Sequence, residues 1–270
     1  AMDVDLAGFG LERVSYIGKG NFACCQLVRE FATGQIFVAK CVKLESLSDS
    51  YQTLAHQEVF LLEALSHPLI VAYHDSFLLQ EQDILVILME HCEGGDLRQL
   101  IAEKTAAGTP LEESQIMTWF AQLTLALQYI HGEKVLHRDL KCSNVFLVNG
   151  GSMLKLGDFG ISRVFEGSRD AAVTLVGTPY YMSPEVCSNE PYSWKSDVWS
   201  LGCVLYELCT FKHAFEHKSL QGLVHRIKAG SYEPIPDHYS KELHDLIRQL
   251  LTISVDLRPS INDVIAQPFV

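Results

Sequence analysis

Apolar and polar positions alternate through the first 90 or so residues in a pattern typical of β-strands. The segments Phe22–Phe31 and Gln35–Leu44 are rich in β-formers, and the turn sequence Ala32-Thr33-Gly34 separates them. Two more strands are expected over Val71–Leu79 and Ile84–Met89, on either side of a short polar connection. The first part of the chain is therefore expected to be built mainly from strands.

One helix is expected among these strands, because the period of the apolar positions changes between Ser50 and Ser66. Leucines at positions 54, 61, 62 and 65 fall on one helical face, and Glu58 falls on the same face. A carboxylate on an apolar stripe needs a partner when it is buried. We therefore expect Glu58 to form an ion pair.

The sequence Glu93-Gly94-Gly95-Asp96 ends the strand pattern, and helices are expected after it. Three apolar helical faces can be traced in this second part of the chain. Their residues are Ile116, Phe120, Leu123, Leu127 and Ile130; Val198, Leu201, Leu205 and Leu208; and Leu243, Leu246, Ile247, Leu250 and Leu251. The pattern predicts an α+β protein with a small β-rich N-lobe (about 9–90), a hinge (about 91–95) and a larger, mainly helical C-lobe (about 96–270), together forming one domain over residues 1–270.

Composition narrows the possible partners. The chain has 33 acidic and 21 basic residues, a formal charge of −12, which argues against a general binder of nucleic acid or of anionic membranes. No apolar run approaches the ~20 residues of a membrane-spanning helix, and no signal peptide is expected at the start. The eight cysteines contain no Cys-x-x-Cys pair, which argues against a zinc site. In a chain of this length without a secretory signal, reduced thiols are favoured over disulfides.

A glycine-rich segment, Gly18-Lys19-Gly20-Asn21-Phe22-Ala23, fits the dinucleotide-binding pattern G-x-G-x-x-A. That pattern requires a helix directly after the loop and an acidic residue about 20 positions later. Here a strand follows, and residues 36–43 contain lysines instead of an acid. The segment is better explained as a hairpin whose backbone N–H groups cover phosphates.

Lys40 lies on the apolar strand that follows this hairpin, within Phe37-Val38-Ala39-Lys40. A solvated lysine on an edge strand is the simple alternative. Glu58 favours a functional role, because each of the two residues supplies the partner that the other needs. We expect an ion pair that holds Lys40 against the α- and β-phosphates of a nucleotide.

The segment from His137 to Asn144 places Asp139 five residues before Asn144. An aspartate there suits acceptance of a substrate hydroxyl proton, and Asn144 suits ligation of Mg²⁺. Asp158-Phe159-Gly160 follows within an apolar context, and a carboxylate and an amide carbonyl are ligands that Mg²⁺ accepts. Asn144 and Asp158 are therefore the expected metal ligands.

With these motifs in this order, the chain resembles the protein kinase superfamily over nearly its whole length. Ser183-Pro184-Glu185, Asp197 in the sequence Asp-Val-Trp-Ser-Leu-Gly, and Arg258-Pro259 extend the resemblance. It implies a buried pair between Glu185 and Arg258 and a structural role for Asp197. The alternative for Asp197 is a simple acid at a helix N-terminus, favoured by the helix dipole.

The chain further resembles the NIMA-related (Nek) serine/threonine kinases. The segments that carry this resemblance are Leu156–Gly160, Gly177–Glu185, Lys195–Thr210, Lys212–Glu216 and Met89–Leu97. Lys141, two residues after Asp139, is also the residue typical of serine/threonine kinases. The resemblance implies ATP and Mg²⁺ as cofactors and proteins with Ser or Thr acceptors as substrates.

The resemblance also assigns roles to individual residues. Asp139, Lys141, Lys40 and Glu58 form the expected catalytic set, with Lys141 beside the γ-phosphate. Met89 is expected beside the adenine, Glu90 and Cys92 to bond it through their backbone, and Asp96 to lie near the ribose. The full expected ATP-binding set is Ile17, Gly18, Lys19, Gly20, Asn21, Phe22, Ala23, Cys25, Ala39, Lys40, Met89, Glu90, Cys92 and Asp96.

The segment Gly160–Glu185 is the expected regulatory switch, and Thr174 is its expected phosphorylation site. Arg138, next to Asp139, can receive that phosphate through charge-assisted hydrogen bonds. An unmodified, solvated Thr174 is the alternative. Thr178, by contrast, is expected to have a structural role near Asp139 and Lys141.

The chain departs from the family pattern at two positions in the expected phosphate-covering loop. Ala23 replaces the third glycine, and since alanine lacks free access to positive φ, a stiffer loop is expected. Cys25 replaces the usual valine and would place a thiol above the nucleotide. Neither change removes a charge needed for phosphoryl transfer.

An active enzyme is therefore favoured over a nucleotide-binding pseudokinase scaffold, which is the main alternative. A tyrosine or dual-specificity kinase is a second alternative, and Lys141 argues against it. By family resemblance the expected location is the cytoplasm, with the centrosome, cilium or cytoskeleton as sites of action linked to the cell cycle.

Overall fold

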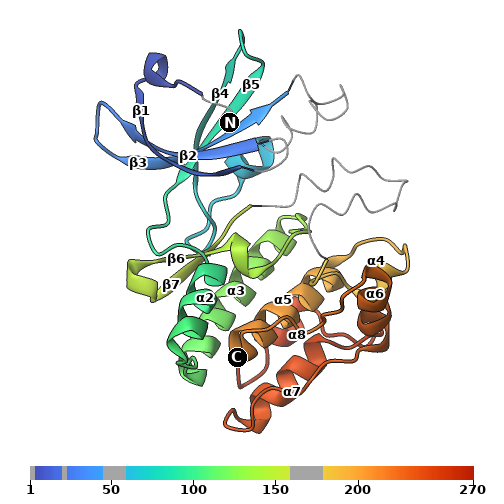
Figure 1. Cartoon of the computed structure of the whole chain (residues 1–270). Helices are drawn as coiled ribbons and strands as arrows, with labels where there is room; N and C mark the ends of the chain where they lie inside the picture. The colour runs from blue at the N-terminus through green and yellow to red at the C-terminus, as the bar shows by residue number, and fades with distance from the viewer. Residues whose placement is uncertain (1–3, 20–22, 45–58, 159–178) are drawn as a thin grey trace. The chain divides into compact units, whose positions relative to one another are not determined.

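The computed structural model describes residues 4–19, 23–44, 59–158 and 179–270. The chain divides into two compact units, Ala1–Glu93 and Gly94–Val270 (Figure 1). The first is dominated by strands and the second by helices, which confirms the predicted α+β class.

The first unit is built on a five-stranded sheet in the order β1-β2-β3-β5-β4, with every neighbouring pair antiparallel. Residues 59–64 are helical, within the segment expected to form the one helix of this unit. The four predicted strands are confirmed as β2 Ala23–Glu30, β3 Ile36–Lys43, β4 Tyr73–Leu79 and β5 Ile84–Glu90. The sheet also contains β1 Leu11–Lys19, which the apolar pattern did not predict and which follows the 3₁₀ turn η1 Ala7–Phe9.

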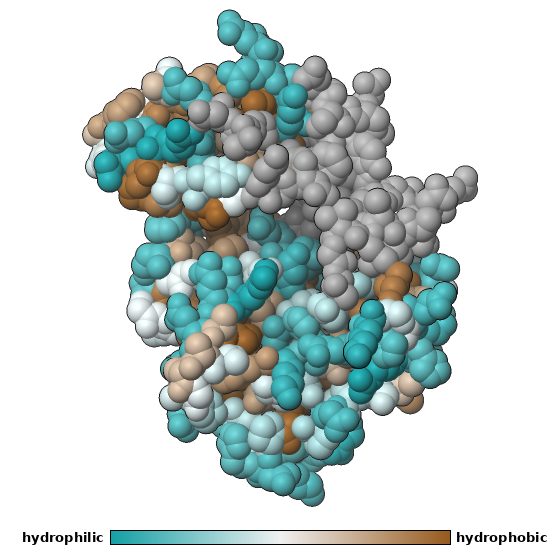
Figure 2. All heavy atoms as spheres, in the orientation of Figure 1, coloured by the Kyte–Doolittle hydropathy of each residue, from teal (hydrophilic) through white to brown (hydrophobic). Residues whose placement is uncertain are grey.

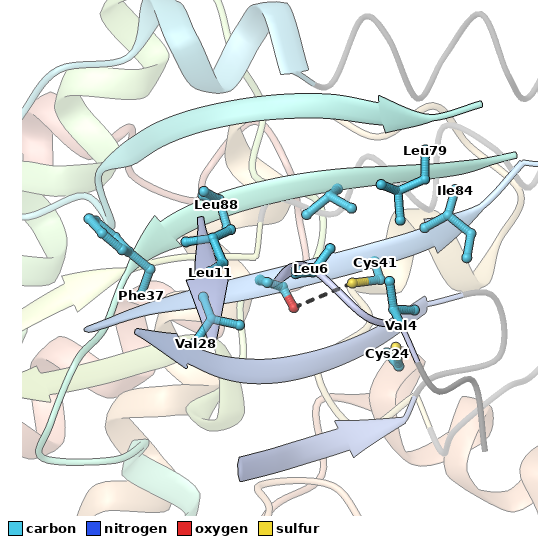
Figure 3. Packing of buried hydrophobic residues seen from close by; sticks show 12 residues of the cluster. Val4, Leu6, Leu11, Cys24, Val28, Phe37, Cys41, Leu79, Ile84 and Leu88 are labelled. Carbon is cyan, nitrogen blue, oxygen red and sulfur yellow. Dashed lines mark hydrogen bonds between the residues drawn. The ribbon is translucent and has the colours of Figure 1, made fainter. Parts of the chain in front are cut away.

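One face of this sheet carries the core of the first unit (Figure 3). Phe37, Ala39 and Cys41, at alternate positions of β3, are all buried on it. Cys24 on β2 is directly opposite Cys41 and is also buried. Because side chains alternate across a strand, the residues between these lie on the other face of the sheet.

The segment before β1 contributes to the same core. Val4 and Leu6 are 1% and 3% exposed and belong to the cluster that covers Cys24 and Cys41 (Figure 3). Gln26 on β2 donates a hydrogen bond from Nε2 to the backbone oxygen of Val4 at 3.3 Å. The start of the chain is thus held on the sheet by both apolar packing and a buried hydrogen bond.

The second unit consists mainly of helices, with a small antiparallel sheet of β6 and β7. The three predicted apolar helical faces are confirmed, because their residues are all buried. The longer helices are α2 Leu97–Ala107, α3 Glu113–Gly132, α5 Trp194–Thr210, α6 Leu220–Ala229 and α7 Lys241–Leu250. The shorter elements are η2 Cys142–Asn144, β6 Val145–Val148, η3 Asn149–Gly151, β7 Met153–Leu156, α4 Pro184–Cys187 and α8 Ile261–Ile265.

Helix α5 is the centre of this unit, since every residue from Ser196 to Cys209 is buried. A helix buried all round must be covered on several sides, and α3, α7 and α8 pack against it (Figure 1). Its first turn carries Asp197, and its last turns carry Glu207. Both side chains therefore reach neighbouring loops from a rigid support.

The surface of the second unit is largely polar on the face shown in Figure 2, with apolar residues in scattered patches. Within the described parts of the chain, none of the helices combines the length and the apolar character needed to cross a membrane. All eight cysteines lie in the described parts of the chain, and none of them forms a disulfide bond there.

Candidate active site

Asp139 lies in the loop between α3 and η2, and two neighbouring side chains hold its carboxylate. Lys141 Nζ is 2.6 Å from Asp139 Oδ2. Asn144 Nδ2 donates to the same Oδ2 at 3.1 Å and to the backbone oxygen of Asp139 at 2.8 Å. The side chains of Asp139 and Lys141 remain 18% and 35% exposed. An accessible carboxylate in a fixed orientation can accept a proton from a bound hydroxyl.

His137 fixes the backbone just before Asp139. It is fully buried, and its Nε2 lies 3.2 Å from the backbone oxygen of Gly157, while its Nδ1 lies 3.3 Å from the backbone nitrogen of Asp139. Since a carbonyl only accepts, Nε2 carries the proton and Nδ1 accepts from Asp139 N–H. Burial lowers the pKa of His137 despite the nearby carboxylates, which keeps the ring neutral in this tautomer.

Asn144 joins this loop to Asp158, the other expected metal ligand. Its Nδ2 lies 3.4 Å from the backbone oxygen of Asp158, and its backbone oxygen accepts from Gly157 N–H at 3.0 Å. The amide nitrogen of Asn144 thus points toward the oxygens of Asp139 and Asp158, and the Oδ1 atom of the same amide points away from them. Together with the exposed Asp158 carboxylate, this supplies the oxygen donors that Mg²⁺ prefers. The residues present therefore fit a magnesium ion.

Asp197 fixes the backbone of the loop that carries Asp139. Its carboxylate accepts from the backbone N–H groups of His137 and Arg138, each at 3.0 Å, and from Tyr192 Oη at 2.5 Å. It also lies 2.8 Å from His131 Nε2. Burial acts to raise the pKa of Asp197, but the hydrogen bond from His131 and the nearby imidazoles outweigh it, so the pKa is lowered.

These contacts explain how Arg138 can hold a left-handed backbone, with φ of 65°. Asp197 is in the first turn of α5, as the helix-dipole alternative requires, yet its bonds go to the loop that carries Asp139. The geometry therefore favours the structural role expected for Asp197.

Glu185 and Arg258 form a buried ion pair in the second unit. Arg258 Nη1 and Nη2 donate to Glu185 Oε1 and Oε2 at 2.9 Å and 3.0 Å, a two-pronged geometry. Ser196 Oγ donates to Glu185 Oε1 at 2.7 Å, and Trp199 lies against the guanidinium at 5.0 Å. The pair joins α4 to α5 and to the segment before α8.

In the first unit, Lys40 lies within a row of residues that crosses the sheet. Cys25 on β2 is directly opposite Lys40, Gly18 on β1 is opposite Cys25, and Ile87 on β5 lies on the other side of Lys40. Lys40 and Cys25 are both half-buried. Directly opposite residues share a face of the sheet. The side chains of Cys25, Lys40 and Ile87 therefore lie on one face, next to Gly18.

Ala39 is a correction to the expected ATP-binding set. It lies on the opposite face from Lys40, is fully buried, and packs in the core with Phe37 and Cys41. Successive residues of a strand point to opposite faces, so Ala39 and Lys40 cannot both face one ligand. Val38 is two residues before Lys40, is half-buried and lies on the face of Lys40. The side chain of Val38, and not that of Ala39, therefore shares the face of Lys40.

The remaining described members of the set lie at strand ends and after β5. Met89 is directly opposite Val38, which places it on the face of Lys40. Glu90 Oε2 accepts from Ala72 N–H at 3.1 Å. Asp96 Oδ1 caps α2 by accepting from Gln99 N–H at 2.8 Å, so this side chain stabilises the start of the helix.

The other described members of the set lie near the ends of the strands. Ile17, Gly18 and Lys19 belong to β1, and Ile17 is 53% exposed. Ala23 begins β2, and Cys92 is half-buried just after β5.

Several expected site residues lie outside the described residues. They are Gly20, Asn21, Phe22, Glu58, Thr174 and Thr178. The expected Lys40–Glu58 pair and the phosphorylation site at Thr174 therefore remain predictions.

A family model for the protein kinase domain matches residues 11–270. The chain belongs to the protein kinase family. This domain is 46% identical over 256 residues to human serine/threonine-protein kinase Nek5, covering 95% of this chain and 36% of the relative. It is 44% identical over 259 residues to mouse serine/threonine-protein kinase Nek1, covering 96% of this chain and 21% of the relative.

A similar match reaches probable serine/threonine-protein kinase nek3 of Dictyostelium discoideum, 44% identical over 262 residues. The chain spans only 21%, 23% and 36% of the length of these three relatives. The resemblance to Nek kinases is confirmed for the kinase domain. A protein kinase domain binds ATP, typically with Mg²⁺.

The kinase domain also contains a polar cluster that the sequence did not predict. Tyr181 Oη donates to Glu207 Oε2 at 2.5 Å, and His213 Nδ1 lies 3.2 Å from the same oxygen. Tyr181 Oη also accepts from the backbone N–H of Cys142 at 3.5 Å. Tyr181, Glu207 and His213 are 26 and 6 positions apart, and no periodicity relates them, so only the fold brings them together.

Proposed function

We propose that this domain is a Nek-like serine/threonine kinase that transfers the γ-phosphate of ATP to Ser and Thr hydroxyls of proteins. The observation that carries the proposal is that Lys141 and Asn144 both bond one carboxylate oxygen of Asp139, whose side chain remains 18% exposed. A scaffold without activity would not need a partly exposed carboxylate that two side chains hold in place at this point of the loop.

Asp139 orients the acceptor hydroxyl and accepts its proton as phosphoryl transfer proceeds. Lys141 holds Asp139. When ATP is bound, Lys141 would lie beside the γ-phosphate, where its charge would favour the developing negative charge. Asn144 and Asp158 would hold Mg²⁺, which neutralises charge on the phosphates when it is bound. Lys40, paired with Glu58, would orient the α- and β-phosphates.

Adenine contacts are assigned to the first unit and the segment after it. Val38, Met89 and Cys25 supply side chains on the face of Lys40. Ile17 on β1 is 53% exposed and is assigned to the same task. The backbones of Glu90 and Cys92 would form hydrogen bonds with the adenine. The Asp96 carboxylate would accept a hydrogen bond from the ribose through its Oδ2 atom.

Activation is proposed to depend on phosphorylation of Thr174, whose phosphate Arg138 would bind. The Arg138 backbone is fixed by Asp197, so the side chain starts from a defined position. Phosphopeptide mapping of the active enzyme after incubation with ATP should find phosphate on Thr174. A fully active enzyme with Thr174 unmodified would contradict this part of the proposal.

Proteins that carry Ser or Thr acceptors are the proposed partners, in the cytoplasm and at the centrosome, cilium or cytoskeleton. The Nek resemblance of the domain supports a link to the cell cycle. The negative charge of −12 favours basic acceptor segments over acidic ones.

The direct test is incubation with ATP, Mg²⁺ and a degenerate peptide array, with Asp158→Ala as the matched inactive variant. We expect phosphoserine and phosphothreonine from the wild type and none from the variant. No transfer by the wild type would support a nucleotide-binding scaffold instead. Phosphotyrosine alone would overturn the proposed substrate class.

A further inference from the structure

His213 lies in the connection between α5 and α6, where it contacts three side chains. Its ring stacks on Tyr180 with the centroids 4.0 Å apart and the planes 15° apart. The Tyr181 ring meets the imidazole edge-on at 5.7 Å. Its Nδ1 lies 3.2 Å from Glu207 Oε2, and the imidazole side chain is 28% exposed. One residue therefore contacts two consecutive tyrosines and a carboxylate.

The Glu207 carboxylate needs hydrogen-bond partners, because its side chain is only 7% exposed. Tyr181 donates its hydroxyl proton to Glu207 Oε2. Burial, together with nearby Cys142 and Glu207, raises the pKa of Tyr181, so the phenol stays protonated and remains a donor. His213 and Tyr181 thus share one carboxylate oxygen, which sets the distance between them.

The same tyrosine reaches the loop that carries Asp139. The backbone N–H of Cys142 donates to Tyr181 Oη at 3.5 Å, and Cys142 directly follows Lys141 and begins η2, the turn that ends at Asn144. A continuous set of contacts therefore runs from His213 through Glu207 and Tyr181 to this loop. Tyr180 joins this set of contacts through its stacking on the His213 ring.

Tyr180 and Tyr181 belong to the stretch between Pro179 and the start of α4 at Pro184. The sequence Gly177–Tyr181 resembles the substrate loop of serine/threonine kinases. We propose that His213 is a positioning residue for the protein substrate: it fixes this stretch relative to the loop that carries Asp139 and Lys141. The inference rests on the proposed kinase function and names a residue that the catalytic assignments do not use. His213 acts through Tyr180 and Tyr181, and it takes no part in binding ATP.

Three variants separate the two kinds of contact that His213 makes. His213→Ala removes both the ring stacking and the bond to Glu207. His213→Phe keeps a ring for Tyr180 and loses the bond to Glu207, whereas His213→Asn keeps a polar group and loses the stacking. We expect His213→Ala to raise the peptide KM about tenfold, the change that corresponds to the loss of one or two such contacts. The Phe and Asn variants should fall between it and the wild type.

Initial rates should be measured with peptide varied at saturating ATP and with ATP varied at saturating peptide, with Tm recorded in parallel. The KM for ATP should stay within about twofold of the wild-type value, because no ATP contact is assigned to this cluster. His225→Ala, an exposed histidine on α6, is the matched control and should leave both constants unchanged. A merely structural role would lower Tm without separating the two KM values.

An unchanged peptide KM in His213→Ala would overturn the inference, as would equal rises in the KM for ATP and for peptide. Should His213→Ala fail to fold, the Phe and Asn variants decide, and wild-type peptide KM in both would overturn it. A wild type that phosphorylates no peptide would overturn the proposed function and this inference with it. An active wild type with unaffected His213 variants would overturn this inference alone.

Discussion

The side chains of Glu185 and Arg258 are 3% and 0% exposed, so their ion pair is almost completely removed from water. Removing two charges from water is costly, and the cost is offset here by two direct bonds and the added donor Ser196. Once one partner is lost, the other charge stays buried without an opposite charge beside it. Such a pair fixes which segments meet more than it adds net stability.

We predict that Glu185→Gln lowers the free energy of unfolding by about 3–5 kcal/mol, the usual cost of breaking a buried pair. Urea denaturation followed by circular dichroism measures this change. The matched control is Asp245→Asn, which breaks the Arg248–Asp245 pair on α7, whose side chains are 71% and 38% exposed. That exposed pair should contribute about 1 kcal/mol or less. Equal losses in the two variants would contradict the interpretation.

The stabilising effect of Glu185 should also depend on pH. Burial acts to raise the pKa of Glu185, but the hydrogen bonds from Arg258 and Ser196 outweigh it and hold the pKa below its ordinary value of 4.5. Because the folded pKa is lower than the unfolded one, this stabilisation is complete above pH 4.5 and is lost as pH falls through the folded pKa. The difference in unfolding free energy between wild type and Glu185→Gln should therefore shrink below pH 4.5. A difference that grows on acidification would contradict this sign.

Cys25 offers a second test at the residue scale. It is half-buried and shares the face of Lys40, whereas its neighbour Cys24 is 1% exposed on the core face and Cys41 is fully buried. Burial raises the pKa of Cys41, so that thiol is not a reactive thiolate. We predict that an electrophile built on an ATP-site ligand labels Cys25 and leaves Cys24 and Cys41 unlabelled.

Peptide mapping by mass spectrometry after labelling identifies the modified cysteine, and excess ATP should protect it. Cys25→Ser is the control and should remove this label. Unchanged labelling of the variant, or labelling of Cys24 in the folded protein, would show that the thiol assignment is wrong.

The error at Ala39 shows what the sequence could and could not supply at the residue scale. A family motif identifies Lys40, but the face on which each neighbour lies follows from the alternation of the strand. That alternation is visible in the sequence and points to Val38. By contrast, His213 is joined to Tyr180 and Glu207 only by tertiary contacts, which no local pattern encodes.

At the scale of elements, the segment before β1 acts as a cover for the sheet although it contains only the short turn η1. Val4 and Leu6 fill the space over Cys24 and Cys41, and Gln26 bonds the backbone of Val4 (Figure 3). Six or seven residues without a period give no pattern from which such packing could be predicted. Strands β2 to β5 and the three apolar helices, in contrast, have long enough patterns to be predicted correctly.

We predict that Leu6→Ala weakens the first unit, because it removes a side chain that is 3% exposed in the core. The expected cost is about 2–5 kcal/mol for a buried leucine. Amide hydrogen exchange should show faster exchange in β2 and β3, while the amides of α5 in the second unit keep their protection. Leu78→Ala on β4, where the leucine is 38% exposed, is the matched control with a cost of about 1 kcal/mol or less. Unchanged exchange in β2 and β3 would contradict a covering role for the segment.

At the scale of the whole molecule, the two units contribute different chemistry to the proposed reaction. The first unit offers Lys40, Cys25, Val38 and Met89 on one face of its sheet. The second offers the loop of Asp139, supported by α5 through Asp197 and by η2 through Asn144. The sequence predicted this division because the motifs for each task occur in separate parts of the chain, one rich in strands and one rich in helices.

The most direct test of the account is single-turnover transfer from ATP–Mg²⁺ to a Ser- or Thr-containing peptide, comparing the wild type with Asp139→Asn. The amide keeps the shape of the side chain and removes its ability to accept a proton, so nucleotide binding should persist. We predict that the rate of the chemical step falls by about 100-fold or more while the Kd for ATP changes by less than about threefold. A wild type that transfers no phosphate, or an Asp139→Asn variant that transfers it at the wild-type rate, would contradict the account.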